Sequence, residues 1–126
     1  MPTALQIEPE MMAVYRATAQ RRWEQEQQRL ARRRERGRQA AKRAAAWLKE
    51  QFSATQVVVF GSLVHDHWFS STSDIDLAVW GLSADEYLVA VAKLQDLSPE
   101  FKVDLVAVER CRPTLRKVIT REGVII

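Results

Sequence analysis

Residues 56–77 read QVVVFGSLVHDHWFSSTSDIDL, and this stretch decides the fold. The run 56–60 is short, rich in β-branched residues and ended by a glycine, which is typical of a buried strand. Residues 75–80 alternate acidic and apolar side chains and predict a second strand. Residues 102–108 repeat the alternation around Asp104 and predict a third. The order of strand, Gly-Ser turn, loop and acidic strand therefore predicts a sheet that carries carboxylates on one face.

Helix-forming residues surround these strands. Ala, Arg, Gln and Glu dominate residues 8–52 and predict helix throughout. At 1.5 Å per residue a single helix of this length would extend about 65 Å, so we expect it either to project from the domain or to break. Gly37 is the expected break point, because glycine weakens a helix interior.

The apolar residues of this helical region form two stripes. Before Gly37 the stripe is thin, so most of the helix surface is expected to face solvent. After Gly37 the stripe is broader, which predicts a helix that packs on the sheet. The thin stripe consists of Met12, Tyr15, Ala19, Trp23 and Leu30; the broad stripe consists of Ala40, Ala41, Ala44, Trp47, Leu48 and Phe52.

Further local signals complete the element order. Ser83 and Glu86 form a capping-box pattern before a helix expected over 87–97. Pro113 opens a short helix over 114–121, and residues 124–126 can add an edge strand. The sequence therefore predicts an α/β (α+β) fold, in which a small mixed sheet has helices packed on one face and an extended N-terminal helix. We expect residues 1–37 to form a helical extension for partner or dimer contact and residues 38–126 to form the domain proper.

Composition narrows the class of protein. With 126 residues, 47% of them hydrophobic, the chain is long enough for one ordinary core. Residues 1–51 hold twelve Lys/Arg against six Asp/Glu and residues 52–126 hold seven against ten, so the two parts should meet different partners. A single cysteine, Cys111, excludes an internal disulfide and a four-cysteine zinc site. No secretory leader and no apolar run of about 20 residues is found, which predicts a cytoplasmic protein without a membrane span.

The candidate site residues lie at the strand ends. Gly61 and Ser62 form a turn whose backbone amides and hydroxyl can approach a phosphate. Asp74 and Asp76 are two residues apart, so their side chains share a face and can hold a divalent cation, with oxygen ligands favouring Mg²⁺ or Mn²⁺. Asp104 lies in an apolar strand, where a carboxylate needs a cation or a hydrogen-bond partner. Three carboxylates beside a phosphate-binding turn are what metal-assisted phosphoryl or nucleotidyl transfer needs.

This pattern of Gly-Ser, loop and Asp-x-Asp resembles the minimal nucleotidyltransferase family of the polymerase-beta-like superfamily. The resemblance covers about residues 38–126, including the Ser-Asp-Ile-Asp-Leu sequence, the later Val-Asp-Leu-Val strand and the closing Glu-Gly. It implies a nucleotidyltransferase-like fold. It also implies an antitoxin that transfers AMP from ATP to a tyrosine of a HEPN-family toxin.

The resemblance also implies residue roles. Asp74 and Asp76 would coordinate Mg²⁺ or Mn²⁺, and Asp104 would be the third ligand or the general base. Gly61, Ser62 and Ser73 would bind the nucleotide.

Two other functions stay open from the sequence. The loop 63–68 reads LVHDHW, whereas family loops often continue with a basic residue and a second glycine, so a binding-only antitoxin is one alternative. His65 and His67 could serve as substitute phosphate donors, as metal ligands or as ordinary loop residues. The basic stretch 32–38 is a solvated helix face, a partner or dimer contact, or a nucleic-acid-binding surface. The thin apolar stripe favours partner binding or homo-oligomer formation through the N-terminal helix.

Overall fold

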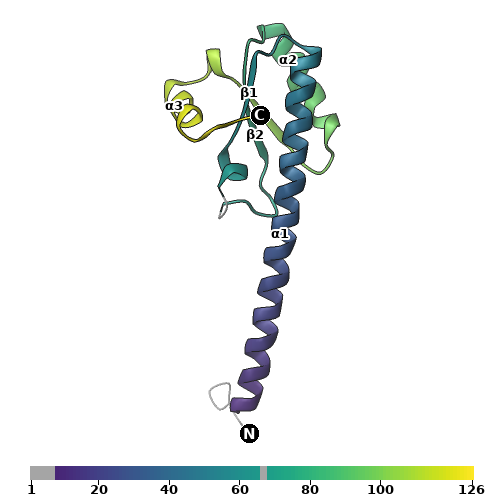
Figure 1. Cartoon of the computed structure of the whole chain (residues 1–126), viewed down its shortest axis with the longest axis vertical. Helices are drawn as coiled ribbons and strands as arrows, with labels where there is room; N and C mark the ends of the chain where they lie inside the picture. Colours follow the sequence, from purple (N-terminus) through teal and green to yellow (C-terminus); the bar gives the residue numbers. More distant parts are fainter. Residues whose placement is uncertain (1–7, 66–67) are drawn as a thin grey trace. The chain divides into compact units, whose positions relative to one another are not determined.

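The computed structural model describes residues 8–65 and 68–126. The chain divides into two compact units, Met1–Arg32 and Arg33–Ile126. The described residues form helices, strands and short 3₁₀ turns, which Figure 1 shows coloured along the chain. In chain order they are α1 (Pro9–Gln51), β1 (Gln56–Phe60), η2 (Gly61–Val64), β2 (Ile75–Trp80), α2 (Ala84–Leu97), β3 (Val103–Ala107), η3 (Val108–Arg110), α3 (Pro113–Glu122) and β4 (Val124–Ile125).

The second unit contains a mixed four-stranded sheet in the order β3-β2-β1-β4. β1 pairs antiparallel with β2 and with β4, whereas β2 pairs parallel with β3. A parallel pair needs a crossover connection, and α2 supplies it. The expected α/β fold with a small mixed sheet is therefore confirmed. In the part of the chain that is described, no helix has the length and apolar content needed to cross a bilayer.

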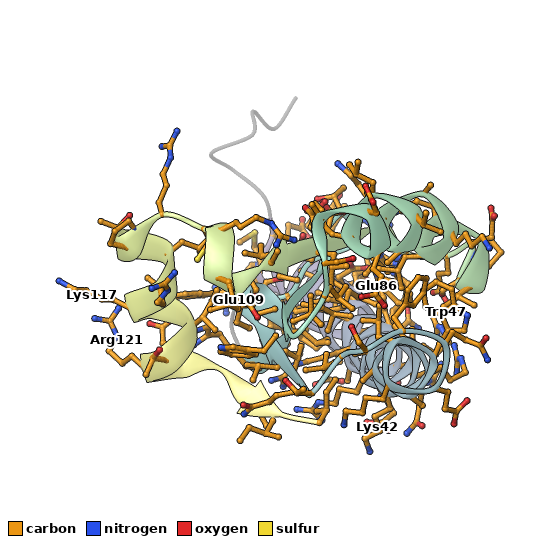
Figure 2. All side chains as sticks on the ribbon, turned by 90° about the horizontal axis from the view of Figure 1, so that it is seen from above. Lys42, Trp47, Glu86, Glu109, Lys117 and Arg121 are labelled. Atoms are coloured by element: carbon orange, nitrogen blue, oxygen red, sulfur yellow. The ribbon has the colours of Figure 1, made fainter. Side chains whose placement is uncertain are left out.

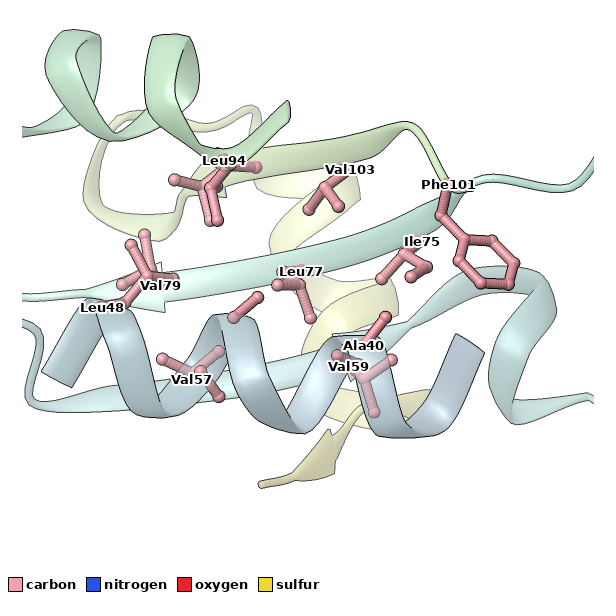
Figure 3. Close-up of a cluster of buried hydrophobic side chains, with 14 of the residues drawn as sticks. Ala40, Leu48, Val57, Val59, Ile75, Leu77, Val79, Leu94, Phe101 and Val103 are labelled. Carbon is pink, nitrogen blue, oxygen red and sulfur yellow. The ribbon is translucent and has the colours of Figure 1, made fainter. Parts of the chain in front are cut away.

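The two faces of the sheet are covered differently. One face packs against α1 and α2, and its core contains Leu48 of α1, Leu77 of β2 and Leu94 of α2, all fully buried. Figure 3 shows these side chains meeting between the helix and the strands. The second face carries a smaller cluster in which Ile119 of α3 packs against Phe60 and its neighbours. We expected helices only on the face without carboxylates, but α3 shares the carboxylate face.

α1 continues through Gly37, so the expected break at this residue is wrong. Gly37 is buried, and a Cβ built on it would lie 3.1 Å from Leu63 Cδ1 and 3.5 Å from the ring of Phe69. The glycine therefore allows close approach between the helix and the chain that follows β1. Close packing compensates for the helix-propensity cost of about 1 kcal/mol that made a break the expected outcome.

The remaining local signals behave as predicted. Ser83 Oγ accepts a hydrogen bond from the Glu86 amide, and the Glu86 carboxylate accepts one from the Ser83 amide, so the capping box is confirmed. Glu86 also accepts hydrogen bonds from the backbone and hydroxyl of Ser53, and these bonds lower the pKa of Glu86 to about 2. This carboxylate therefore ties the end of α1 to the beginning of α2.

Side chains of α2 cover the edge strand β3. Gln95 Nε2 donates to the Val103 carbonyl at 2.8 Å, and the Val103 amide donates back to Gln95 Oε1 at 3.3 Å. The Tyr87 hydroxyl donates to the Leu105 carbonyl at 2.8 Å. These bonds occupy backbone groups that an unprotected edge would offer to another strand.

Replacing Gly37 tests its packing role. We expect Gly37→Val to lower the free energy of unfolding by about 2 kcal/mol, because the added methyl groups overpack a site bounded by Leu63, Phe69 and Phe101. Urea denaturation measures the effect. Arg43→Val introduces the same β-branched residue at an exposed position of α1 and should change stability by less than about 1 kcal/mol. Equal losses in the two variants would contradict the packing argument.

Candidate active site

The carboxylate site is built by the register of the parallel strands β2 and β3. Asp76 and Asp104 are direct partners across the two strands. Ile75 and Leu77 face the α1 and α2 core, so the alternation of the strand turns Asp76 to the opposite face, and the same holds for Asp104 between Val103 and Leu105. The structure thus brings together two predicted site residues that are 28 positions apart in the sequence.

Asp76 is the electrostatic centre of the site. Burial, the carboxylate of Asp104 and the carboxylate of Asp74, in that order, raise the pKa of Asp76 from 3.8 to about 6. Asp74 directly precedes β2, which places it close enough to act on Asp76. Among the described residues no basic side chain forms an ion pair with Asp76, whereas Asp104 Oδ1 lies 3.8 Å from Lys102 Nζ. Negative charge is therefore gathered at Asp76 without compensation.

Gly61 lies directly against Asp76. It has a φ of +74°, and a Cβ added to it would collide with Asp76 Oδ2. Glycine is required here on both counts, because L side chains rarely adopt this φ and no space exists for one. The next residue, Ser62, is half-buried, and its hydroxyl makes no hydrogen bond within the described residues. A free hydroxyl and a close backbone thus stand beside the acidic centre, as a phosphate-binding turn requires.

The acidic centre fits a hard divalent cation by its chemistry. Oxygen ligands and unbalanced negative charge are what Mg²⁺ and Mn²⁺ select. In the described residues, however, no three acidic, histidine or cysteine side chains converge closely enough to form a complete cation site.

Arg33 fixes the turn that leads into Asp74. Its Nε donates to the Ser70 carbonyl at 3.3 Å and its second terminal nitrogen donates to the Ser73 carbonyl at 3.2 Å. The guanidinium lies 4.4 Å from the ring centre of Phe101 and only 14% of the side chain is exposed. Ser73 Oγ accepts from the Ser70 amide at 2.8 Å, so this predicted nucleotide-binding residue also shapes the turn.

The basic stretch 32–38 is not a uniformly solvated helix face. Arg33 holds the turn, Arg34 Nε donates to the Leu63 carbonyl at 3.2 Å, and Arg36 forms a two-nitrogen pair with Glu100. Sequence reasoning treated the stretch as one surface and missed these roles, because the partners lie 29 to 64 positions away. The broad apolar stripe recurs every three or four residues, and no proline interrupts the helix before it. Continuing this spacing toward the N-terminus would have placed Arg33 and Gly37 on the helix face that carries the stripe.

Of the two histidines in the loop, His65 is described by the structure. His65 Nε2 lies 3.3 Å from Glu122 Oε2, and both side chains are half-buried. Its ring also lies against Trp68, with centres 4.1 Å apart. Asp66 and His67 fall outside the described residues. Trp68 is 64% exposed, whereas Phe69 is buried against the α1 core and anchors the loop.

A mixed sheet with paired strand carboxylates beside a Gly-Ser turn defines a nucleotidyl-transfer type of domain. Residues 42–126 match the family model described as "Polymerase beta, Nucleotidyltransferase". The match covers more than half of the chain, and this protein belongs to that nucleotidyltransferase family. No curated protein matches the chain significantly.

Solved structures show the same fold. A chain of a toxin-antitoxin complex with AMP-PNP has a TM-score of 0.54 and 23% identity, over 64% of this chain and 66% of that chain. A chain of the Shewanella oneidensis complex of a tri-AMPylated HEPN toxin with MNT antitoxin has a TM-score of 0.54 and 19% identity, over 71% and 70%. A chain of the MntA-HepT toxin-antitoxin has a TM-score of 0.54 and 20% identity, over 70% of this chain and 69% of that chain. This chain thus spans about two thirds of the first of them.

Substituting Arg33 tests the support of the acidic turn. We expect Arg33→Ala to lower the free energy of unfolding by about 1–2 kcal/mol, because two carbonyls and the Phe101 ring lose their partner. Amide hydrogen exchange should also accelerate at residues 73–75. Arg29→Ala, which removes an exposed pair with Glu26 on the same helix, is the control and should leave exchange in this turn unchanged. Faster exchange in both variants would show that Arg33 has no special role.

The raised pKa of Asp76 gives a pH dependence with a definite sign. Between about pH 4 and pH 6 the folded chain keeps a proton that the unfolded chain releases, so this carboxyl lowers stability as pH rises through the folded pKa. In metal-free buffer we expect Asp76→Asn to be more stable than the native chain by about 1–2 kcal/mol at pH 7.5. The two should be nearly equal at pH 4.

Urea denaturation at the two pH values checks this prediction. Asp96→Asn removes an exposed carboxylate of α2 and should show no such pH-dependent gain. A gain for Asp76→Asn that is the same at both pH values would argue against a raised pKa.

Proposed function

We propose that this chain is a metal-dependent nucleotidyltransferase that transfers AMP from ATP to a tyrosine of a HEPN-family toxin. One observation carries the transferase proposal: the β2 and β3 register sets Asp76 opposite Asp104, with Asp74 beside them and Gly61 against Asp76. Such a site offers carboxylate oxygens to a cation and a glycine turn to the phosphates of the same substrate.

The residues divide into two groups by role. Asp74 and Asp76 would hold Mg²⁺ or Mn²⁺, which when bound offsets the charge of the triphosphate and of the departing pyrophosphate. The Gly61 backbone and the Ser62 hydroxyl would bind phosphate oxygens. Ser73 would contribute by fixing the turn before Asp74, where its hydroxyl accepts from the Ser70 amide.

Asp104 is suited to the acceptor side of the reaction. Its side chain is 46% exposed, so an acceptor hydroxyl can reach it from solvent. In the proposed step the acceptor oxygen bonds to the α-phosphorus of ATP, the bond from that phosphorus to pyrophosphate breaks, and Asp104 receives the hydroxyl proton. The alternative role for Asp104 is that of a third cation ligand.

The proposal for the partner rests on two features. Solved structures with this fold include an MNT antitoxin in complex with a tri-AMPylated HEPN toxin and a toxin-antitoxin with AMP-PNP. In this chain the N-terminal unit exposes Met11, Val14, Tyr15 and Trp23, each at least half exposed. Apolar side chains grouped on one helix favour a protein partner or a second copy of the chain.

A binding-only antitoxin is the second candidate, and His65 favours it. The sequence offers this residue as a substitute phosphate donor, but its Nε2 lies 3.3 Å from Glu122 Oε2. A histidine engaged with a carboxylate is less available to phosphate. Under this alternative the carboxylates would be dispensable for neutralising the toxin.

Label transfer from ATP tests the transferase proposal. With a purified HEPN-family toxin from the same genome, Mg²⁺ and ATP labelled at the α-phosphate, we expect the toxin to become labelled. Asp76→Asn should reduce the rate at least about 100-fold, because it removes a charge that acts on the transferred group. Asp96→Asn, an exposed acid of α2, is the matched control and should keep full activity.

Toxin neutralisation in the same variants separates the two candidates. Loss of both label transfer and neutralisation in Asp76→Asn supports the enzyme. Neutralisation that survives in this variant, together with no labelling by the native chain, supports the binding-only antitoxin.

A further inference from the structure

A cleft of about 260 Å³ lies away from the carboxylates, between α1, η2 and the end of the chain. One wall belongs to α1 and presents Arg34, Arg38 and Lys42. The other wall is apolar and consists of Leu63, Val64, Val124 and Ile126, with Val59 and Ala41 between the walls. Val59 faces the α1 core, whereas Asp76 and Asp104 face the other side of the sheet. The cleft and the carboxylate site are therefore separate.

Two side chains of the basic wall, Arg38 and Lys42, carry charge that the described residues offset only weakly. Arg38 approaches Glu35 at 3.6 Å, but both side chains are about half exposed, so this pair is weak. Lys42 is exposed and forms no ion pair within the described residues. Figure 2 shows Lys42 pointing away from α1. Weakly compensated positive charge beside an apolar wall is complementary to a ligand that is acidic on one side and apolar on the other.

The open edge of the sheet borders the same cleft. β4 pairs only with β1, and Val124 and Ile125 are 51% and 68% exposed. The opposite edge, β3, is covered by Gln95 and Tyr87. An extended peptide can therefore approach the sheet more freely beside β4 than beside β3.

Spacing matches an extended peptide to this cleft. Arg38 and Lys42 are four residues apart, so they lie about 6 Å apart along α1. Alternate residues of an extended strand point the same way and are about 6.6 Å apart. A strand with acidic residues at every second position can thus meet successive basic residues, while its apolar residues turn to the Val64 and Val124 wall.

We propose that this cleft binds an extended segment of a protein partner in which acidic and apolar residues alternate. The segment lies between α1 and β4, with its carboxylates on Arg38 and Lys42 and its apolar side chains against Val64, Val124 and Ile126. The proposal requires no nucleotide and no carboxylate chemistry, so it stands independently of the proposed transferase function.

Fluorescence anisotropy with a labelled eight-residue peptide of alternating Glu and Val tests the proposal. We expect the full chain to bind this peptide. It should bind the alternating Lys-Val peptide, which lacks acidic residues, and the alternating Glu-Ser peptide, which lacks apolar residues, at least about tenfold more weakly. Arg38→Glu with Lys42→Glu should weaken binding at least about tenfold. Asp76→Asn should leave it unchanged.

A charge-matched control separates the cleft from general electrostatic attraction. Lys117→Glu with Arg121→Glu makes the same change on α3, whose side chains Figure 2 shows on the far side from Lys42, and should leave binding intact. Equal weakening by the two double variants would overturn the proposal, as would the absence of binding to the Glu-Val peptide. Tighter binding of single-stranded RNA, lost in the Arg38 and Lys42 variant, would overturn it in favour of a nucleic-acid surface.

Discussion

The parallel register of β2 and β3 is the constraint on which the rest of the structure depends. It sets Asp76 opposite Asp104, so two carboxylates must share one half-buried position of the sheet. Burial first, and then the carboxylates of Asp104 and Asp74, raise the pKa of Asp76 to about 6. Because Gly61 has no side chain, the turn can approach Asp76 closely. Arg33 donates a hydrogen bond to the turn before Asp74. The surrounding fold thus stabilises a site that would be unfavourable by itself, as is common where binding energy is reserved for a ligand.

α1 connects features that are distant in the sequence. Its C-terminal part supplies the core of one sheet face through Leu48 and the alanines. Closer to its centre, Gly37 allows Leu63 and Phe69 to approach, and Arg33 reaches the carbonyls of Ser70 and Ser73. The chain after β1 is therefore shaped as much by the helix that precedes the sheet as by its own residues.

Sequence reasoning predicted the strands, the capping box and the strand positions of the acidic residues, because these depend on local periodicity and local hydrogen bonds. β1 spans the expected residues, and Ser83 and Glu86 cap α2 as expected. The continuity of α1 was not predictable, since the packing around Gly37 involves residues 26 and more positions away. The role of Arg33 was hidden for the same reason. Cation binding at Asp74, Asp76 and Asp104 stays a prediction, supported by the chemistry of the residues and by membership of the nucleotidyltransferase family.

The covering of β3 by Gln95 and Tyr87 has a consequence for self-association. Fibrous cross-β stacking requires each copy to offer two free strand edges, one to accept a neighbour and one to pass the pairing on. In the described part of this chain both backbone groups of Val103 and the carbonyl of Leu105 already bond to α2 side chains. Two copies can join through β4, but a third must displace these α2 side chains before it can pair with β3.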